Sequence, residues 1–344
     1  MTGIRNWLFD IELLRSTGFE LPIISVGNLS VGGAGKTPHV EFLLTSLQNE
    51  FKMAVLSRGY KRKTKGFYLA DEKSNNQTLG DESFQIHQKF SNVTVAVDEK
   101  RVHGVVKLRE LHPDIQIIVL DDAFQHRNIR PGFSILVTDY SNLYCHDSML
   151  PAGSLREWTS NSKRANIIIV GKCPVDIKPI DMRLVETELK PETNQHLFFS
   201  SYEYSELKAV FENNETEPFF TYNILKDRKT SVLLVAGIVS PEPIVDHLKK
   251  YTPNVETLFF PDHHSFTQKD FNLISKRFES ISGSEKIILM TEKDAARLLM
   301  NPFYPEALKN ITFAVPIEVK ILNNQENNFI QIIKNYVAEY SRNS

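Results

Sequence analysis

Short apolar runs alternate with stretches of helical periodicity along most of this chain, and this alternation limits the folds open to it. The run Ile115–Leu120 is almost continuously apolar, which is typical of a strand buried on both faces of a parallel sheet. Strands that alternate with helices of this length predict a doubly wound α/β sheet. The expected strands of the first part are Pro22–Val26, Met53–Ser57, Val93–Val97, Ile115–Leu120, Phe133–Val137 and Ile167–Val170. The expected helices there are Lys36–Gln48, Asp81–Lys89 and Glu99–Leu111, with Gly66–Ala70 as a short hairpin arm.

The pattern weakens from about residue 203 to residue 230 and then restarts. The stretch FENNETEPFFTYN is polar and has no clear helical period, so we expect a linker or extended ribbon over 203–230. This divides the chain into a core lobe, 1–202, and a smaller α/β lobe, 231–344, with a cleft between them. The later elements expected are strands Val232–Ala236, Val255–Phe260 and Lys286–Met290 and helices Pro241–Lys250, Thr267–Phe278 and Glu326–Tyr340. The last helix carries one apolar stripe and is able to pack back on the core.

Composition excludes several classes of protein. A net charge of −2 over 344 residues argues against a nucleic-acid-binding surface, and no obligate protein partner is predicted. The two cysteines, Cys145 and Cys173, are too few for a disulfide framework or a four-thiolate zinc site and fit a reducing cytoplasm. No apolar run reaches the roughly 18 residues of a membrane-spanning helix. Residues 7–15 have the spacing of a short amphipathic helix, which either touches a membrane interface or packs on the domain.

A glycine-rich loop between a strand and a helix is the strongest chemical signal. The segment SVGNLSVGGAGKTPH ends as a P-loop does, although Ser30 stands where the first glycine of that motif belongs. Glycines let backbone N–H groups wrap a phosphate, and the helix N-terminus adds its dipole. Lys36 would reach the β- and γ-phosphates of a nucleotide, and Thr37 would bind Mg²⁺. The expected nucleotide-binding residues are Gly32, Gly33, Ala34, Gly35, Lys36 and Thr37.

Asp121 and Asp122 end the most apolar strand. A carboxylate at this place holds Mg²⁺ in P-loop proteins, and ligands bind at the carboxyl ends of such strands. The alternative is a capping pair that starts the next loop. Gln125 and His126 follow closely, either to reach phosphate or acceptor or to form hydrogen bonds within a turn.

Two further motifs carry titratable side chains. Asp81 in GDES is either a helix cap or the carboxylate that takes a proton from an acceptor hydroxyl. The pair His263 and His264 follows Asp262 in FPDHH, where three ligands without a cysteine or HExxH partner support zinc only weakly. Orientation of a carboxylate or hydroxyl, or local hydrogen bonding, are the other interpretations.

Softer signals surround these motifs. Five basic residues fall among the eight of Arg58–Lys65, a local anion patch or a solvated loop. The loop PAGSLRE ends in Arg156 and Glu157, Arg101 begins an expected helix, and TEKD at 291–294 follows a strand.

The motifs GNLSVGGAGKTP, SRGYKRK, GDES, DDAFQH, PAGSLRE, FPDHHSFT and TEKDAARL occur in this order. As a set, over nearly the whole chain, they resemble the tetraacyldisaccharide 4′-kinase family of lipid A biosynthesis. The resemblance implies a two-lobed P-loop enzyme that uses ATP and Mg²⁺ to phosphorylate the 4′-hydroxyl of tetraacyldisaccharide 1-phosphate, giving lipid IVA. It also implies a peripheral location on the cytoplasmic face of the bacterial inner membrane. Family members commonly carry a longer apolar segment ahead of RNWLFD, so we expect either a shorter membrane-touching element here or a misplaced start.

The resemblance assigns roles to particular residues. Asp81 matches the catalytic base, and His263, with His264 as the alternative, matches its partner. Lys36 matches the catalytic P-loop lysine, and Thr37 matches the metal-binding threonine. Asp121 and Asp122 match the acidic pair near Mg²⁺. The supporting or substrate-binding positions are Arg58, Arg101, Gln125, Arg156, Glu157 and His264. The alternatives are a P-loop kinase for another acceptor and a P-loop NTPase that switches or assembles partners.

Overall fold

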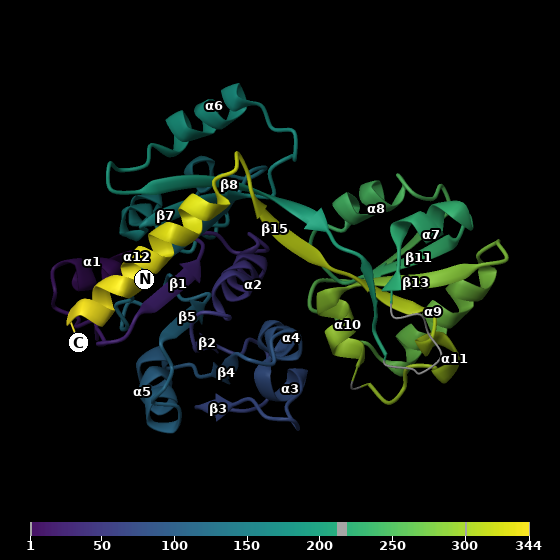
Figure 1. Cartoon of the computed structure of the whole chain (residues 1–344), viewed down its shortest axis with the longest axis horizontal. Helices are drawn as coiled ribbons and strands as arrows, with labels where there is room; N and C mark the ends of the chain where they lie inside the picture. The colour runs from purple at the N-terminus through teal and green to yellow at the C-terminus, as the bar shows by residue number, and fades with distance from the viewer. Residues whose placement is uncertain (1, 212–218, 300, 344) are drawn as a thin grey trace. The chain divides into compact units, whose positions relative to one another are not determined.

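The structure is a computed structural model that describes residues 2–211, 219–299 and 301–343 (Figure 1). Its contacts divide the chain into a larger unit, Met1–Glu203 with Val319–Ser344, and a smaller unit, Tyr204–Glu318. The smaller unit thus starts near residue 204 rather than at 231. The final helix belongs with the larger unit, because its apolar stripe packs into that unit's core.

The larger unit contains a nine-stranded sheet in the order β15-β8-β7-β6-β1-β5-β2-β4-β3. The strands are β1 (Ile23–Gly27), β2 (Met53–Ser57), β3 (Tyr68–Leu69), β4 (Thr94–Val97), β5 (Ile117–Asp121), β6 (Phe133–Asp139), β7 (Ile167–Gly171), β8 (His196–Tyr204) and β15 (Ile317–Ile321). From β4 through β8 neighbouring strands pair in parallel, and β3 joins β4 antiparallel. The expected doubly wound, mostly parallel sheet is confirmed.

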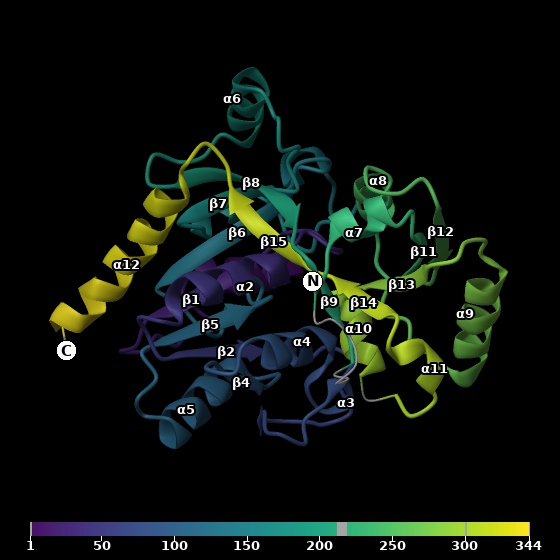
Figure 2. The same ribbon diagram turned by 45° about the vertical axis from the view of Figure 1, so that its right-hand side comes forward.

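Helices cover both faces of this sheet. The helices of the larger unit are α1 (Thr2–Asp10), α2 (Lys36–Leu47), α3 (Asn76–Leu79), α4 (Asp81–Lys89), α5 (Arg101–Leu111), α6 (Pro179–Leu189) and α12 (Glu326–Asn343). Helices α2, α4 and α12 bury apolar side chains against one face, and α2 and α12 can be followed in Figure 2. Helices α5 and α6 pack on the other face. Alternate residues of β1 and β5 point to opposite faces, which explains why both strands are mostly apolar, with Ser25 in β1 and the terminal Asp121 in β5 as the polar exceptions.

The smaller unit has its own six-stranded sheet, in the order β10-β9-β14-β13-β11-β12. Its strands are β9 (Leu207–Ala209), β10 (Phe219–Phe220), β11 (Ser231–Ala236), β12 (Val255–Phe259), β13 (Lys286–Thr291) and β14 (Thr312–Val315). Its helices are α7 (Tyr222–Asp227), α8 (Glu242–Leu248), α9 (Gln268–Ser280), α10 (Glu292–Leu298) and α11 (Glu306–Lys309). Strands β11 to β14 pair in parallel, while β9 and β10 pair antiparallel at one edge.

The region expected as a linker or ribbon is partly structured. Within 203–230 the chain forms the edge strands β9 and β10 and the helix α7, whose N-terminus is capped by Thr221. Residues 212–218, in the middle of that expected linker, lie outside the described residues. The ribbon interpretation is therefore wrong at α7, where Tyr222 and Leu225 turn into the core of the smaller unit.

The N-terminal helix packs on the domain through one side. Helix α1 buries Phe9 and Asn6, yet Trp7 is 57% exposed. Leu13 and Leu14, beyond the end of the helix, are also exposed. Throughout the described ranges, no helix is both long and apolar enough to cross a bilayer.

Candidate active site

The glycine-rich loop connects β1 to α2 at the carboxyl edge of the larger sheet. Gly35 has a φ of 88°, in the left-handed region, and a Cβ atom there would lie 2.1 Å from the hydroxyl oxygen of Tyr202. Both facts require glycine at this position. No side chain of the described residues caps the N-terminus of α2. Its first N–H groups, together with the helix dipole, are suited to bind phosphate.

His39, one turn into α2, holds this loop in place. Its Nδ1 lies 2.7 Å from the carbonyl oxygen of Gly35, and its Nε2 lies 2.9 Å from the Ser200 hydroxyl. A carbonyl oxygen only accepts, so Nδ1 carries the proton and a neutral Nε2 accepts from Ser200. Burial lowers the pKa of His39 to about 4, which keeps the ring neutral.

Lys36 meets the acidic pair because β5 is the neighbour of β1, with Val26 opposite Asp121. The Lys36 ammonium lies 3.6 Å from Asp122 and 3.2 Å from the side-chain oxygen of Asn28. Burial would raise the pKa of Asp122, but the charges of Lys36 and Arg156 lower it overall. The lysine and one aspartate predicted from separate motifs therefore lie together.

Asp121 faces a different environment. Its carboxylate is buried, and among the described residues Oδ1 has no hydrogen-bond partner. Burial and the charge of Asp122 raise its pKa to about 7. A buried carboxylate oxygen that has no partner among the described residues is suited to a divalent cation, and Thr37 lies in the first turn of α2, so these two residues fit the implied Mg²⁺. The part of the chain that the structure describes has no cluster of three or more His, Cys, Asp or Glu arranged to hold a metal.

The PAGSLRE loop is joined to the glycine-rich loop by backbone hydrogen bonds. Val31 donates to the carbonyl oxygen of Ser154 at 2.7 Å, and Arg156 donates to that of Leu29 at 2.8 Å. The Arg156 guanidinium then binds both carboxylate oxygens of Asp122, at 3.0 and 3.3 Å, and the side-chain oxygen of Asn28. Arg156 thus orients the aspartate that pairs with Lys36.

The buried carboxylate of Glu157 accepts hydrogen bonds from three side chains near this site. It is 1% exposed and accepts hydrogen bonds from Gln125 at 2.8 Å, Asn6 at 2.8 Å and Arg164 at 2.7 Å. Gln125 also donates to the backbone oxygen of Asn28 at 2.7 Å. Glu157 and Gln125 therefore join helix α1 to the segments that follow β1, β5 and β6.

Arg101 lies at the start of α5, buried beneath the acidic pair. It donates to the backbone oxygens of Asp98 and Asp121. Burial lowers its pKa to about 10, against the opposing effect of Asp121 and Asp122. Its charge offsets that of the pair. His126 also approaches this group: burial and the neighbouring arginines lower its pKa to about 4.

Asp81 begins α4, directly after Gly80. A Cβ atom on Gly80 would lie 2.7 Å from the backbone oxygen of Tyr60, so Gly80 packs on the loop that follows β2. The hydroxyl groups of Ser57 and Ser83 form a hydrogen bond between the same two segments. Because β2 neighbours β5, Asp81 lies near the carboxyl ends of these two strands, where Asp121 also lies. Arg58, at the same edge, is exposed.

His263 and His264 belong to the smaller unit and have different partners. His264 binds Asp270 at 3.0 Å and stacks on Phe260 with ring centroids 4.7 Å apart. His263, at a φ of 60°, lies 3.2 Å from the Lys293 ammonium and 3.4 Å from the Arg297 guanidinium. His263 therefore contacts Lys293 of the TEKD motif and Arg297 one turn later, whereas His264 is part of a local structural contact.

Several residues of this network were missed from the sequence. Asn28 binds Lys36, Arg156 and Gln125, and Asn6 and Arg164 bind Glu157. Asn28 stands inside GNLS and Asn6 inside RNWLFD, but an asparagine in a loop has no distinctive spacing. His39 was missed because a histidine in the first turn of a helix is usually unremarkable.

A doubly wound sheet whose first strand leads through a glycine-rich loop to a lysine, with an acidic pair on the adjacent strand, defines an α/β protein of the P-loop NTPase type. Residues 1–338 match the family described as Tetraacyldisaccharide-1-P 4′-kinase, and the chain belongs to that family.

Relatives and a solved structure agree with this membership. A Tetraacyldisaccharide 4′-kinase of Bacteroides thetaiotaomicron is 48% identical over 99% of this chain and 91% of its own length. One of Flavobacterium johnsoniae is 42% identical over 98% of this chain and 94% of its own length. The crystal structure of LpxK from Aquifex aeolicus in complex with ATP is 26% identical, with a TM-score of 0.73 over 98% of this chain and 95% of that one.

Proposed function

We propose that this protein transfers the γ-phosphate of ATP to the 4′-hydroxyl of a tetraacyldisaccharide 1-phosphate, the step that gives lipid IVA. The observation that carries the proposal is the uncapped N-terminus of α2 with Lys36 held 3.6 Å from Asp122. A solved structure of similar fold contains ATP, and relatives carry the kinase name over almost their whole length.

The glycine-rich loop and the acidic pair bind the nucleotide in this proposal. Backbone N–H groups of Gly32 to Gly35 wrap the phosphates, and Lys36 offsets the charge that develops on them. Thr37 and Asp121 would hold Mg²⁺, which supplies charge neutralisation on the phosphate oxygens when bound. Asp122 is held by Arg156 and in turn orients Lys36.

Asp81 acts as the base that takes the proton from the 4′-hydroxyl. Its position at the N-terminus of α4, at the same sheet edge as Asp121, supports this role. The family resemblance assigns to His263 the role of orienting this base. The internal pairing of His264 with Asp270 favours His263 over His264 for this task.

The test is transfer of radiolabelled γ-phosphate from ATP to tetraacyldisaccharide 1-phosphate in detergent micelles. We expect label on the lipid with the unaltered protein, and kcat lower by about 10²-fold or more with Asp81→Asn while ATP still binds. Lys293→Ala and His263→Ala are measured beside it to assess the orienting residue.

The outcomes separate this function from its rivals. Label released only as inorganic phosphate, by folded protein that binds ATP, would support an NTPase that acts on a partner. Transfer to a soluble sugar but not to the lipid would support another acceptor. Near-normal turnover by Asp81→Asn would refute the base and leave the kinase assignment standing.

We further propose a peripheral position on the cytoplasmic face of the inner membrane, where such a lipid substrate is presented. The exposed apolar side chains of Trp7, Ile11, Leu13 and Leu14 support this location.

A further inference from the structure

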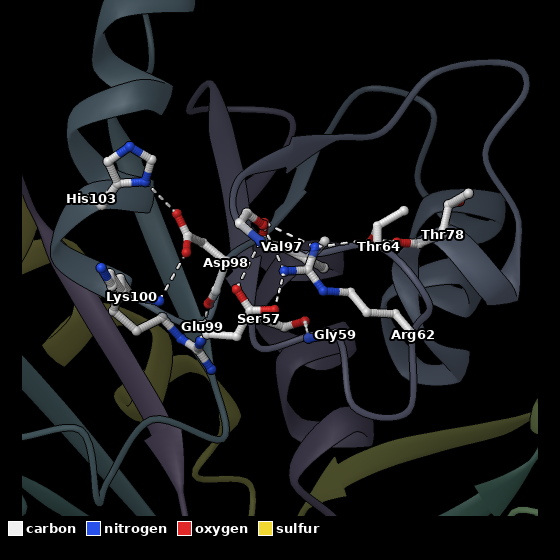
Figure 3. Close-up of polar contacts among 12 residues, drawn as sticks. Ser57, Gly59, Arg62, Thr64, Thr78, Val97, Asp98, Glu99, Lys100 and His103 are labelled. Carbon is white, nitrogen blue, oxygen red and sulfur yellow. Dashed lines mark hydrogen bonds and ion pairs between the residues drawn. The ribbon is translucent and has the colours of Figure 1, made fainter.

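One cation in the loop after β2 is turned inward. The loop 58–66 exposes Lys61, Lys63 and Lys65, as a solvated basic patch would. The side chain of Arg62, in the same loop, is only 2% exposed. Figure 3 shows its guanidinium turned toward Val97 and Thr64. The Arg62 side chain is therefore buried within the protein, whereas those of its basic neighbours face solvent.

The guanidinium of Arg62 closes the loop on itself. One terminal nitrogen donates to the backbone oxygen of Gly66 at 2.6 Å and to the carboxylate of Glu99 at 2.7 Å. The other donates to Thr64 at 3.3 Å and approaches the backbone oxygen of Val97 at 3.5 Å. The second carboxylate oxygen of Glu99 accepts from the Gly66 N–H at 3.0 Å. We call Arg62 and Glu99 together the Arg62–Glu99 clasp.

The clasp connects to the residue before Asp81 through direct packing. A Cβ atom on Gly59 would lie 2.3 Å from Cδ of Arg62, so the arginine stem rests on Gly59. A Cβ atom on Gly80 would lie 2.7 Å from the backbone oxygen of Tyr60 and 3.1 Å from the carbonyl carbon of Gly59. The contacts therefore run from the Arg62 side chain, through the Gly59–Tyr60 backbone, to Gly80.

Hydrogen bonds attach the same loop to the helix that precedes Gly80. Lys63 donates its N–H to the backbone oxygen of Gln77 at 2.7 Å. The Thr64 hydroxyl, which also accepts from Arg62, donates to the backbone oxygen of Thr78 at 2.6 Å. With the loop fixed by Arg62, α3 and the first residue of α4 are fixed too.

The other end of the clasp reaches the acidic pair. Glu99 adjoins Asp98, whose N–H donates to the backbone oxygen of Ser57 at 3.0 Å. The backbone oxygen of Asp98 accepts from Arg101, and Arg101 also donates to the backbone oxygen of Asp121 at 3.4 Å. The clasp thus lies between the segment that carries Asp81 and the segment that supports Asp121.

We infer that the Arg62–Glu99 clasp fixes the position of Asp81 relative to the acidic pair, so that Arg62 is a positioning residue for phosphoryl transfer. The inference rests on the proposed function, because it takes Asp81 as the base. A base displaced by about 1 Å is expected to cost up to about 10²-fold in rate. Lysine is a poor substitute, since a single ammonium cannot bind Gly66, Glu99 and Thr64 with the fixed fork of a guanidinium.

The test measures kcat, the KM for ATP and thermal unfolding for Arg62→Ala and Arg62→Lys. We expect kcat to fall by about 10- to 100-fold for Arg62→Ala, with a smaller fall for Arg62→Lys. The KM for ATP should stay within about twofold, because the glycine-rich loop is untouched. Arg62→Ala should fold, because the remaining Glu99 side chain is 41% exposed and can be hydrated. Lys52→Ala is the matched control, since Lys52 pairs with Asp114 at the same 2.7 Å, exposed in the same unit.

A double substitution separates positioning from general damage. If Arg62 acts through Asp81, adding Arg62→Ala to Asp81→Asn should lower kcat by no more than about twofold further. Full multiplication of the two effects, or an Arg62→Ala enzyme with kcat within twofold of the unaltered protein, would overturn the inference. Normal turnover by Asp81→Asn alone would instead show that the base assignment had failed, and the clasp with it.

Discussion

Individual residues at this site are held by partners distant in sequence. Arg156 binds Asn28, and Asn6 binds Glu157, and in both pairs the partners are more than a hundred residues apart in the sequence. Arg156 also binds Asp122. Each contact orients a group that meets the nucleotide in our proposal. Substitution of such a supporting residue should therefore change the geometry of Lys36 and the acidic pair before it changes their chemistry.

His39 gives a prediction about pH. Its pKa is about 4 in the fold, against 6.5 ordinarily, because burial favours the neutral ring. The unfolded chain binds this proton more readily, so the contribution of His39 to stability is complete above pH 6.5 and is lost as pH falls toward 4. We expect His39→Asn to reduce the acid destabilisation in that window by up to roughly 3 kcal/mol.

The measurement is urea unfolding at several pH values between 4 and 7.5. His196→Asn, at an exposed position in β8, is the control and should follow the unaltered protein. An unchanged pH dependence in His39→Asn would show that His39 does not supply this effect.

At the residue scale, the sequence predicted that Lys36 and the acidic pair lie together, but it did not reveal the side chains that support them. Lys36, Asp121 and Asp122 are marked by fixed spacing from a strand end, and they do lie together. Arg62 looked like one of five cations in a basic patch, because its partner Glu99 is 37 positions away. Sequence spacing does not reveal which of several similar side chains is buried.

At the scale of elements, prediction succeeded where both faces of a strand are buried. Strands β1, β2 and β5 are mostly apolar because helices cover both sides of them. β15 was missed, since IEVKI alternates apolar and charged residues at the edge of the sheet. Helix α6 was also missed: Pro179 begins it, and Ile180 and Leu184 are exposed, which obscures its apolar stripe.

Helix α1 carries a prediction about membranes. Trp7 on the helix and Leu13 just beyond it are 57% and 69% exposed, while Phe9 is buried. Replacing Trp7 and Leu13 with serine should weaken binding to vesicles containing anionic lipid by about tenfold, because apolar burial is lost without disturbing the core. The measurement is co-sedimentation of the full chain with such vesicles.

A control pair of substitutions tests whether vesicle binding depends on the N-terminal segment in particular. Val239→Ser and Phe303→Ser remove exposed apolar side chains from the smaller unit. Equal losses of vesicle binding in both variants would contradict a specific role for the N-terminal segment.

At the scale of the whole molecule, the larger unit is built from two stretches of chain, Met1–Glu203 and Val319–Ser344. Phe329 of α12 is 1% exposed and packs on Phe42 and Phe198, with ring centroids 5.6 and 5.2 Å away. We expect Phe329→Ala to destabilise the larger unit by about 3–5 kcal/mol, and ATP to raise its stability again. Thermal unfolding with and without ATP measures both effects.

Phe303→Ala is the control, because Phe303 is 56% exposed. A loss of stability in Phe329→Ala no larger than in this control would show that α12 contributes little to the larger unit.

The return of the chain through β15 has a consequence for biosynthesis. The ribosome releases the smaller unit before it releases α12, whereas the larger unit is complete only once β15 and α12 have been made. Until then, the apolar side chains that later pack on Phe329, Ile333 and Val337 are exposed to water. The nascent larger unit therefore passes through a stage in which chaperone binding and aggregation compete with its completion.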